Sequence, residues 1–225
     1  MHIPDGFINP AVSAGAGLVA AGGFAAAVRQ TRRYLTDRLV PMAALVAAFV
    51  FAAQMVNFPV LPGMSGHLLG AVLAAVLVGP WAGLIVITIV LLVQGLVFAD
   101  GGLSALGLNI VNIGLIAGLG GYAVYRLLLR FTSRSHTAVA RTAAIAAAIS
   151  LPLAALGFVF EYWLGGTVEI STTRVLLAAL GTHALIGIGE GIVTGLVVAA
   201  VMRSRPDLVY GAPDFQGQRT EELVP

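Results

Sequence analysis

Residues 81–98 read WAGLIVITIVLLVQGLVF, an apolar run in which Thr88 and Gln94 are the only polar side chains. A helix of this length and composition can cross the hydrocarbon core of a bilayer, which needs about 20 apolar residues. Similar runs recur along the chain, separated by arginines, prolines and glycines. We predict seven helical spans, at residues 9–28, 39–57, 64–78, 81–98, 104–129, 138–162 and 173–202. The third is short, so a re-entrant hairpin over 64–98 is the alternative.

The composition supports the same class. Hydrophobic residues make up 59% of the chain and charged residues only 10%, whereas a soluble domain averages about 25% charged residues. The 28 glycines suit the close packing of membrane helices. We therefore predict an all-α integral membrane protein, with one multi-pass domain over residues 1–203 and a polar, disordered cytoplasmic tail over 204–225.

Two residue types are missing from the sequence. It has no cysteine, which excludes disulfides and thiolate metal sites, so a transition metal would need nitrogen or oxygen ligands. All of its basic residues are arginine, so it has no lysine for a Walker A loop. Any ATP-driven activity requires a partner ATPase. We also expect the chain to contact the lipid bilayer and not to bind nucleic acid.

The arginines predict the orientation in the membrane. Three groups lie between spans one and two, between spans five and six, and after span seven, and only Arg174 lies on the opposite side. The positive-inside rule makes the arginine-rich side cytoplasmic. The amino terminus, the loop at 58–67 and the Asp100-Gly101-Gly102 loop are then extracytoplasmic.

The chain begins Met1-His2, and this start predicts a metal chelate. No basic region precedes an apolar core there, so we expect no cleaved signal peptide and an intact amino terminus. The terminal amine, the His2 amide nitrogen and the His2 ring then form a five-membered and a six-membered chelate ring. The three nitrogens lie nearly in one plane, which suits Ni(II) or Cu(II), and a fourth nitrogen is needed to complete this plane. His67 follows a Pro- and Gly-rich loop on the same side and is the candidate, unless it only makes a local hydrogen bond at a helix end.

Four stretches carry a resemblance to a known family: MHIPDGF at residues 1–7, NFPV followed by SGHLLG at 57–70, ADGGLSALGLNIVN at 99–112 and GTHALIGIGEG at 181–191. Over residues 1–203 the chain resembles the CbiM/NikM family, the substrate-capture components of energy-coupling factor (ECF) ABC transporters for cobalt and nickel. The resemblance implies that the amino-terminal segment folds into the helical bundle. It also implies that Met1 (amine), His2 (amide and ring) and His67 hold Ni²⁺ or Co²⁺ as the transported substrate.

The resemblance further implies partners and location. These are a transmembrane coupling (T) subunit, ATPase (A) subunits and in some members a small accessory membrane protein, in the inner membrane of a prokaryotic cell. Cobalt would serve cobalamin biosynthesis and nickel would serve nickel enzymes, and the sequence does not separate the two. No catalytic residue is expected in this chain.

Further polar residues are candidates to surround the metal ligands: Asp5, Ser65, Asn109, Asn112, His183 and Glu190. Asp5 either forms a turn or accepts a hydrogen bond from a ligand ring, as carboxylates around metals do. The two asparagines are three residues apart and are predicted to share one helix face, where they support the structure. His183 and Glu190 lie two turns apart, and either steady the site, serve a conformational change or join helices by hydrogen bonds.

Alanines in the second span form a ridge at a spacing of four, at Ala44, Ala48 and Ala52. Small residues let another helix approach closely. In the resembled transporters such a face docks the coupling subunit, although packing within the same chain explains the ridge as well. Two alternative functions are also considered. One is a stand-alone nickel, cobalt or copper permease, and the other is an intramembrane enzyme using His183 and Glu190, for which no catalytic motif is present.

Overall fold

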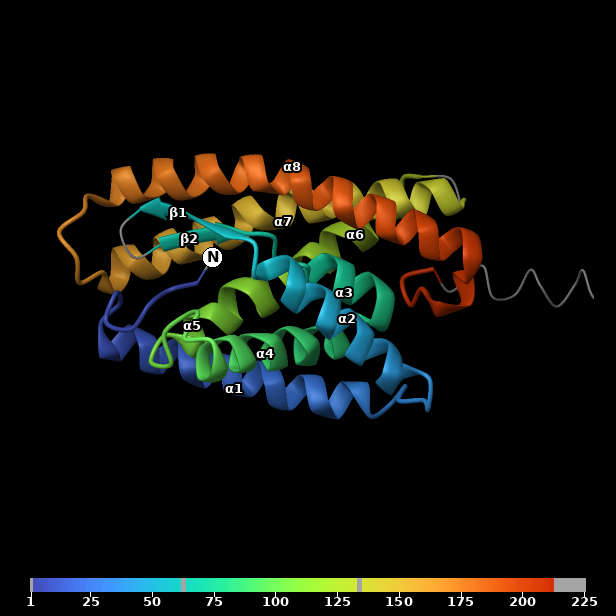
Figure 1. Ribbon diagram of the computed structural model, residues 1–225, viewed down its shortest axis with the longest axis horizontal. Helices are drawn as coiled ribbons and strands as arrows, with labels where there is room; N and C mark the ends of the chain where they lie inside the picture. Colours follow the sequence, from blue (N-terminus) through green and yellow to red (C-terminus); the bar gives the residue numbers. More distant parts are fainter. Residues whose placement is uncertain (1, 62–63, 133–134, 213–225) are drawn as a thin grey trace, which may run out of the picture.

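The computed structural model describes residues 2–61, 64–132 and 135–212, and Figure 1 shows a bundle of helices extended along one axis. Its elements, in chain order, are α1 (Pro10–Thr31), α2 (Leu39–Gln54), β1 (Asn57–Leu61), β2 (Met64–His67), α3 (Ala71–Val78), α4 (Pro80–Val97), α5 (Leu106–Asn109), the π-helical segment η1 (Ile110–Gly120), α6 (Gly121–Leu129), α7 (His136–Gly165), α8 (Thr172–Ser204) and the 3₁₀ turn η2 (Pro206–Leu208). Among these residues, five helices are long and apolar enough to cross a membrane, and α2 is a shorter apolar helix. The prediction of an all-α membrane protein is confirmed.

Side-chain caps fix where three of the long helices begin. The Asn9 side-chain oxygen accepts a hydrogen bond from the Val12 amide at 3.0 Å, and Pro10 follows as the first residue of α1. Ser135 and Ser171 cap α7 and α8 in the same way. These residue types are preferred at helix starts because they satisfy amides that have no partner within the helix. The cap at Asn9 also defines residues 2–8 as a separate amino-terminal segment.

The segment predicted as the third helical span folds differently. β2 pairs antiparallel with β1, and α3 begins only after Gly70, whose φ of +67° lies in the left-handed region. The eight residues of α3 are all buried, and they extend about 12 Å, which is too short to span a bilayer. A non-helical backbone at membrane depth is tolerated where protein covers it. The third predicted span is therefore a strand followed by a short buried helix, not one continuous helix.

Residues 106–129 form one continuous helix that changes its winding. Its central eleven residues, η1, are π-helical, a rare winding with hydrogen bonds between residues five apart that occurs often at functional sites. In this wider winding, the side chains of two residues that are three positions apart point in more different directions than they would in an α-helix. Asn109 and Asn112 were predicted to share one face, but they contact different elements, the amino-terminal segment and α7.

The chain after α8 returns to the bundle. The amides of Tyr210 and Gly211 donate to the carbonyls of Leu77 and Val76 at 3.2 and 2.9 Å. These carbonyls lie at the end of α3, where the helix itself supplies no partners. The predicted disorder therefore does not extend to this part of the tail, and residues 213–225 lie outside the described residues.

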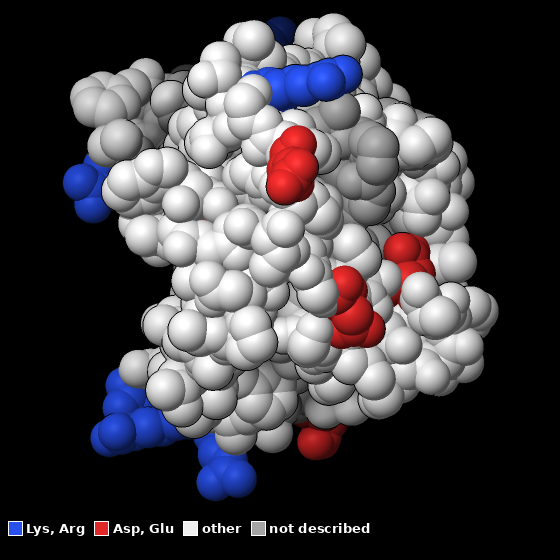
Figure 2. Space-filling view, turned by 90° about the vertical axis from the view of Figure 1, so that its left-hand side faces the viewer, with Lys and Arg blue, Asp and Glu red and all other residues white. Residues whose placement is uncertain are grey.

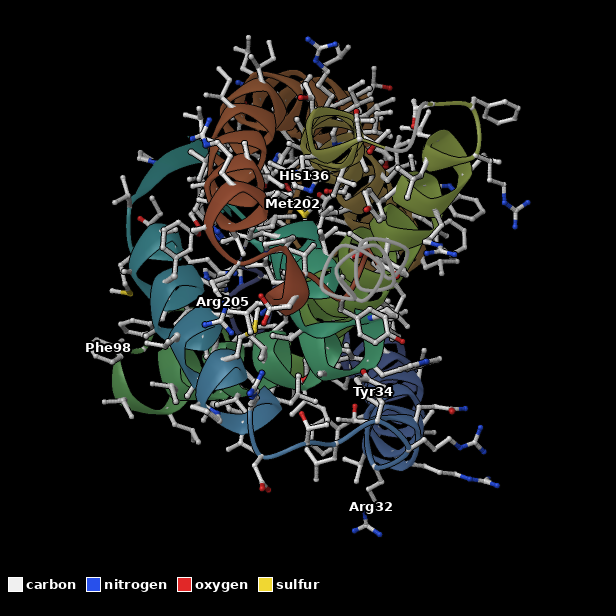
Figure 3. All side chains as sticks on the ribbon, turned by 90° about the vertical axis from the view of Figure 1, so that its right-hand side faces the viewer. Arg32, Tyr34, Phe98, His136, Met202 and Arg205 are labelled. Atoms are coloured by element: carbon white, nitrogen blue, oxygen red, sulfur yellow. The ribbon has the colours of Figure 1, made fainter. Side chains whose placement is uncertain are left out.

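The two ends of the bundle differ in charge. The α1–α2 and α6–α7 connections and the end of α8 lie together at the end we call the arginine end, where Figure 3 labels Arg32 and Arg205. The amino-terminal segment, the β1–β2 hairpin and the α4–α5 and α7–α8 loops lie at the opposite hairpin end (Figure 1). Figure 2 shows this end as a largely uncharged surface with separate acidic side chains. That the arginine end faces the cytoplasm stays a prediction.

Candidate metal centre

The amino-terminal segment is folded into the bundle rather than lying on its surface. Ile3, Phe7 and Ile8 are all buried, and the Phe7 ring packs against aromatic rings of α7. The Asn9 amide donates to the Gly165 carbonyl at 2.7 Å, and Ile8 forms an isolated bridge with the residue after Gly165. These contacts hold the segment against the α7–α8 loop and direct its first residues toward the interior.

Ile3, the residue directly after His2, is held by three hydrogen bonds. Its amide donates to the Asn109 side-chain oxygen at 2.9 Å, and its carbonyl accepts from the Asn109 side-chain nitrogen at 3.4 Å. The Gly102 amide donates to the same carbonyl at 2.9 Å. An asparagine suits this place because one side chain offers both a donor and an acceptor. The predicted supporting role of Asn109 therefore has a direct structural basis.

The α4–α5 loop lies so close to this segment that two glycines are required. A Cβ on Gly101 would lie 3.2 Å from the Nδ1 atom of His2, and Gly101 has a φ of +93°. A Cβ on Gly102 would collide with the Asp5 amide nitrogen and lie 2.6 Å from the Pro4 carbonyl carbon. Only residues without a side chain allow the loop and the segment to approach each other this closely.

Two histidines meet at the end of this segment. The His2 and His67 rings stack with their centroids 4.4 Å apart and their planes at 24°. Both residues are buried, with 4% and 0% of their surface exposed. Neither ring nitrogen of His2 has a hydrogen-bond partner among the residues that the structure describes. Leaving a buried polar atom without a partner costs free energy, so such an atom points to a missing ligand.

A carboxylate lies beside the His2 ring. The distance from the Nε2 atom of His2 to the Oδ2 atom of Asp100 is 3.6 Å, and Asn57 donates to the same oxygen at 3.3 Å. Because Nε2 faces Asp100, Nδ1 remains for a chelate with the main chain. Burial raises the pKa of the Asp100 carboxyl. Asp100 thus has the position of a carboxylate that orients a metal-binding imidazole.

Asp5 was the sequence-based candidate for that role, and the structure places it elsewhere. Its Oδ1 atom accepts from the Ser104 amide at 2.7 Å and from the Ser104 hydroxyl at 2.6 Å, on the exposed side of the segment. The hydrogen bond from the Ser104 hydroxyl is the main reason why the pKa of Asp5 is lowered. Asp5 fastens the amino-terminal segment to the α4–α5 loop, which agrees with the alternative reading of a turn residue.

The hairpin presents His67 in one orientation. His67 pairs with Asn57 at the end of β2, and its Nδ1 atom lies 2.7 Å from the Leu68 carbonyl oxygen. A carbonyl can only accept, so Nδ1 carries the proton and Nε2 carries the lone pair. Ser65 pairs with Pro59 in the same hairpin, two residues away from His67. Burial lowers the pKa of His2, in the amino-terminal segment, to about 3. Its ring is therefore neutral at physiological pH, a form that can bind a metal ion.

Glu190 of α8 fixes the backbone that follows His67. Its two carboxylate oxygens accept from the Leu69 amide at 2.8 Å and the Gly70 amide at 2.7 Å. Gln54, at the end of α2, donates to the Leu69 carbonyl at 2.6 Å. Both main-chain groups of Leu69 are therefore held by buried side chains from other helices. Of the readings open for Glu190, support of the His67 segment is the one that the contacts favour.

His183 lies deep in the bundle near the same hairpin. It has no exposed surface, and its Nδ1 atom lies 2.7 Å from the Ala179 carbonyl oxygen of its own helix. Its Nε2 atom is buried without a hydrogen-bond partner among the described residues. The helix that carries it, α8, contacts both strands of the hairpin that ends at His67. That His183 supports the metal site stays a prediction.

Asn112 has a partner that the sequence did not reveal. Its side-chain nitrogen donates to the Oε2 atom of Glu161 at 2.6 Å, and both residues are buried. Glu161 was not singled out in the sequence, although it is the one carboxylate in a long apolar run of α7. A charged residue within a membrane helix is a signal of function or of a buried partner. The contact joins η1 to α7.

The predicted ligand Met1 lies outside the described residues. Among the residues that the structure describes, no three or more His, Cys, Asp or Glu side chains form a group that could hold a metal ion. His2 and His67 are the two imidazoles that converge. The predicted docking residues Ala44, Ala48 and Ala52 are all exposed, so packing within the described chain does not explain this ridge.

Together, the fold and this site define a multi-pass membrane protein with a buried histidine pair suited to a transition metal ion. A family model, CbiM, described as the cobalt uptake substrate-specific transmembrane region, matches residues 2–208. The chain belongs to this family of cobalt and nickel transport proteins, which places it in a prokaryotic membrane.

Individual relatives agree. A Haloquadratum walsbyi protein named provisionally for metal transport is 38% identical, over 93% of this chain and 94% of its own. The cobalt transport protein CbiM of Sorangium cellulosum is 35% identical over 75% of this chain and 76% of its own. The fused nickel transport protein NikMN of Rhodobacter capsulatus is 33% identical over 93% of this chain and 64% of its own. The crystal structure of a transition metal transporter superposes with a TM-score of 0.84 at 31% identity, covering 90% of this chain and 93% of its own.

Proposed function

We propose that this chain is the substrate-capture subunit of an ECF-type transporter and binds Ni²⁺ or Co²⁺ with high affinity at Met1, His2 and His67. The observation that carries the proposal is the buried stack of two imidazoles, and neither nitrogen of the His2 ring has a hydrogen-bond partner in the described part of the chain. His2 contributes its amide nitrogen and its Nδ1 atom, and His67 contributes Nε2. The terminal amine of Met1 completes four nitrogens in one plane.

The chemistry of the donors limits which ions can bind. Imidazole, amine and amide nitrogens suit nickel, cobalt and copper, and the general affinity order for such sites places Cu²⁺ highest. Selection against copper must therefore come from geometry and from the metal available to the cell. A planar four-nitrogen site favours Ni²⁺, and Co²⁺ tolerates it. Both ions remain candidates for the transported substrate.

The transport step needs partners in this proposal. The chain has no lysine for a Walker A loop, so ATPase subunits and a transmembrane coupling subunit would supply the energy. The exposed alanines of α2 form a surface of small side chains to which a helix of the coupling subunit can pack closely. The fused NikMN relative extends beyond the region shared with this chain, which fits a protein that works with a partner.

A transport assay tests the function and separates it from the stand-alone permease. Cells without their own nickel and cobalt uptake would receive this chain alone, or together with the coupling and ATPase subunits of the same organism. We expect accumulation of radioactive Ni²⁺ or Co²⁺ only with the complete set, and none when the ATPase is inactivated. Uptake by cells that express this chain alone would contradict the proposal and support the permease.

The affinity for Ni²⁺ should rise steeply with pH. The His2 ring is already neutral at pH 6, and the contact of the His67 Nδ1 atom with a carbonyl leaves the lone pair on Nε2. The protons released on binding therefore come from the terminal amine, whose ordinary pKa is about 7.7–8.0, and from the His2 amide. With two protons released, affinity rises roughly 100-fold per pH unit up to about pH 8, and roughly tenfold per unit above it. Calorimetry in buffers of different ionisation enthalpy measures both quantities. An affinity that is constant above pH 6 would rule out coordination by the main-chain nitrogens.

Replacing Glu190 with glutamine should weaken Ni²⁺ binding about tenfold. The amide group of glutamine offers one acceptor where the carboxylate offers two, so one of the two main-chain amides after His67 loses its partner. Loss of supporting contacts around a metal ligand typically costs 10–100-fold in affinity. Glu169→Gln, at an exposed position in the α7–α8 loop, is the matched control. Equal affinities of the two variants, measured by Ni²⁺ titration, would show that Glu190 does not support the site.

A further inference from the structure

A groove separates the exposed faces of α7 and α8 near the arginine end. It has a volume of about 400 Å³, and its floor is made of small residues from both helices, including Ala140, Ala144, Gly191 and Gly195. Arg141 and Arg203 line the same groove. It lies on a different part of the molecule from the histidine pair, and the proposed function makes no use of it.

The shape of the groove follows from the close approach of the two helices. A Cβ on Gly191 would lie 2.8 Å from the Ala144 carbonyl oxygen, and a Cβ on Gly195 would lie 3.0 Å from the Ala144 Cβ atom. Ile192 and Leu196, which also line the groove, are 58% and 66% exposed. In a membrane protein such apolar side chains face lipid hydrocarbon. The groove is therefore apolar along most of its length and opens toward the bilayer.

Its charged residues are confined to one end. On α8 the lining runs from Gly191 to Arg203, a distance of about 18 Å along a helix. Arg203 is in the last turn of α8, and Arg141 is near the start of the antiparallel α7, so both guanidinium groups belong to the arginine end. Figure 3 looks onto this end and labels Met202, the neighbour of Arg203. Both arginines are exposed, and neither has an ion-pair partner among the described residues.

We propose that this groove binds an anionic phospholipid from the leaflet at the arginine end. One acyl chain would lie along the alanine and glycine floor, and the phosphate would lie between Arg141 and Arg203. The arrangement matches the two parts of a phospholipid. The apolar part of the groove is open to the hydrocarbon and suits an acyl chain, and the two arginines at the level of the headgroups suit the phosphate. Basic pockets between membrane helices at the charged side are typical sites for anionic headgroups. A protein helix without acidic side chains would leave both guanidinium groups without an anion.

The test measures lipid retention and thermal stability of the full chain in detergent, with phosphatidylglycerol and phosphatidylcholine as probes. We expect phosphatidylglycerol to raise the unfolding temperature and to remain bound in native mass spectrometry, and phosphatidylcholine to do neither. The double variant Arg141→Gln/Arg203→Gln should bind phosphatidylglycerol about 25-fold more weakly, since each arginine near a membrane surface contributes roughly fivefold. The control Arg29→Gln/Arg32→Gln removes the same charge from the same end and should bind as the native chain does.

A second pair of variants tests the apolar part of the groove without changing its charge. Ala199 lines the groove, whereas its neighbour Ala200 is exposed and does not. Ala199→Phe should fill this part of the groove and weaken phosphatidylglycerol binding at least fivefold, and Ala200→Phe should leave it unchanged. Equal retention of both lipids, or equal losses in the two arginine variants, would overturn the proposal. So would full protection by glycerol phosphate alone, since that would identify an anion site without a lipid.

Discussion

Replacing His67 with alanine is expected to weaken Ni²⁺ binding at least about 100-fold. His67 supplies one of four nitrogens in the proposed plane, and no other imidazole stacks on His2 among the described residues. Changes around a metal ligand already cost 10–100-fold, so loss of the ligand itself should cost at least the upper value. Calorimetric titration of the purified chain with Ni²⁺ measures the effect.

Two controls make the result specific. His136→Ala removes a histidine at the exposed start of α7, at the opposite end of the bundle, and should leave the Ni²⁺ affinity unchanged. The unfolding temperature of His67→Ala without metal shows whether the variant folds. Native affinity in a folded His67→Ala variant would remove this residue from the site.

An extension of three residues, Gly-Gly-Ser, ahead of Met1 should abolish binding to a similar degree, because it moves the amine away from His2. A one-residue extension is unsuitable as a test, since it would place the histidine third and create a new chelate of amine, two amides and imidazole.

Replacing Gly102 with valine is also expected to have a large effect, a loss of Ni²⁺ affinity of about 100-fold. Its side chain would occupy the place of the Asp5 amide and the Pro4 carbonyl carbon. The amino-terminal segment must then move away, which breaks the hydrogen bond from the Gly102 amide to the Ile3 carbonyl. His2 would lose its position beside His67 although both ligands are still present.

The matched control is Gly15→Val in α1, where an added Cβ meets nothing within 4 Å. Limited proteolysis should cut residues 2–8 faster in Gly102→Val than in Gly15→Val, in parallel with the loss of affinity. Native affinity together with native protection of the segment would show that the approach of the loop is not required for the site.

Much of the fold could be predicted because it depends on local properties of the sequence. Apolar runs of membrane-spanning length identified the long helices, and the distribution of arginines separated the two ends. The exception was the segment at 64–78, whose apolar composition resembles a span. Its backbone is stabilised by Gln54 and Glu190, and Glu190 lies 121 residues from Leu69 in sequence. A contact between residues so far apart in the chain produces no periodic pattern in the sequence from which it could be predicted.

That His2 and His67 lie together could be predicted from the sequence, but the residues around them could be predicted less well. His2 was identified by its position behind the amino terminus, and His67 by the family motif. The carboxylate beside His2 was assigned to Asp5, which is close in sequence, but it is Asp100. Asp5 instead accepts two hydrogen bonds from Ser104. Which carboxylate reaches the ring depends on how the α4–α5 loop packs, and Gly101 and Gly102 were not recognised as the residues that permit it.

X-ray absorption at the nickel edge of the metal-loaded chain tests the convergence of the amino terminus and the hairpin most directly. We expect four nitrogen ligands in one plane, two of them imidazoles, and a signal for one imidazole fewer in His67→Ala. A six-coordinate shell of oxygen ligands, or a spectrum that His67→Ala leaves unchanged, would contradict it.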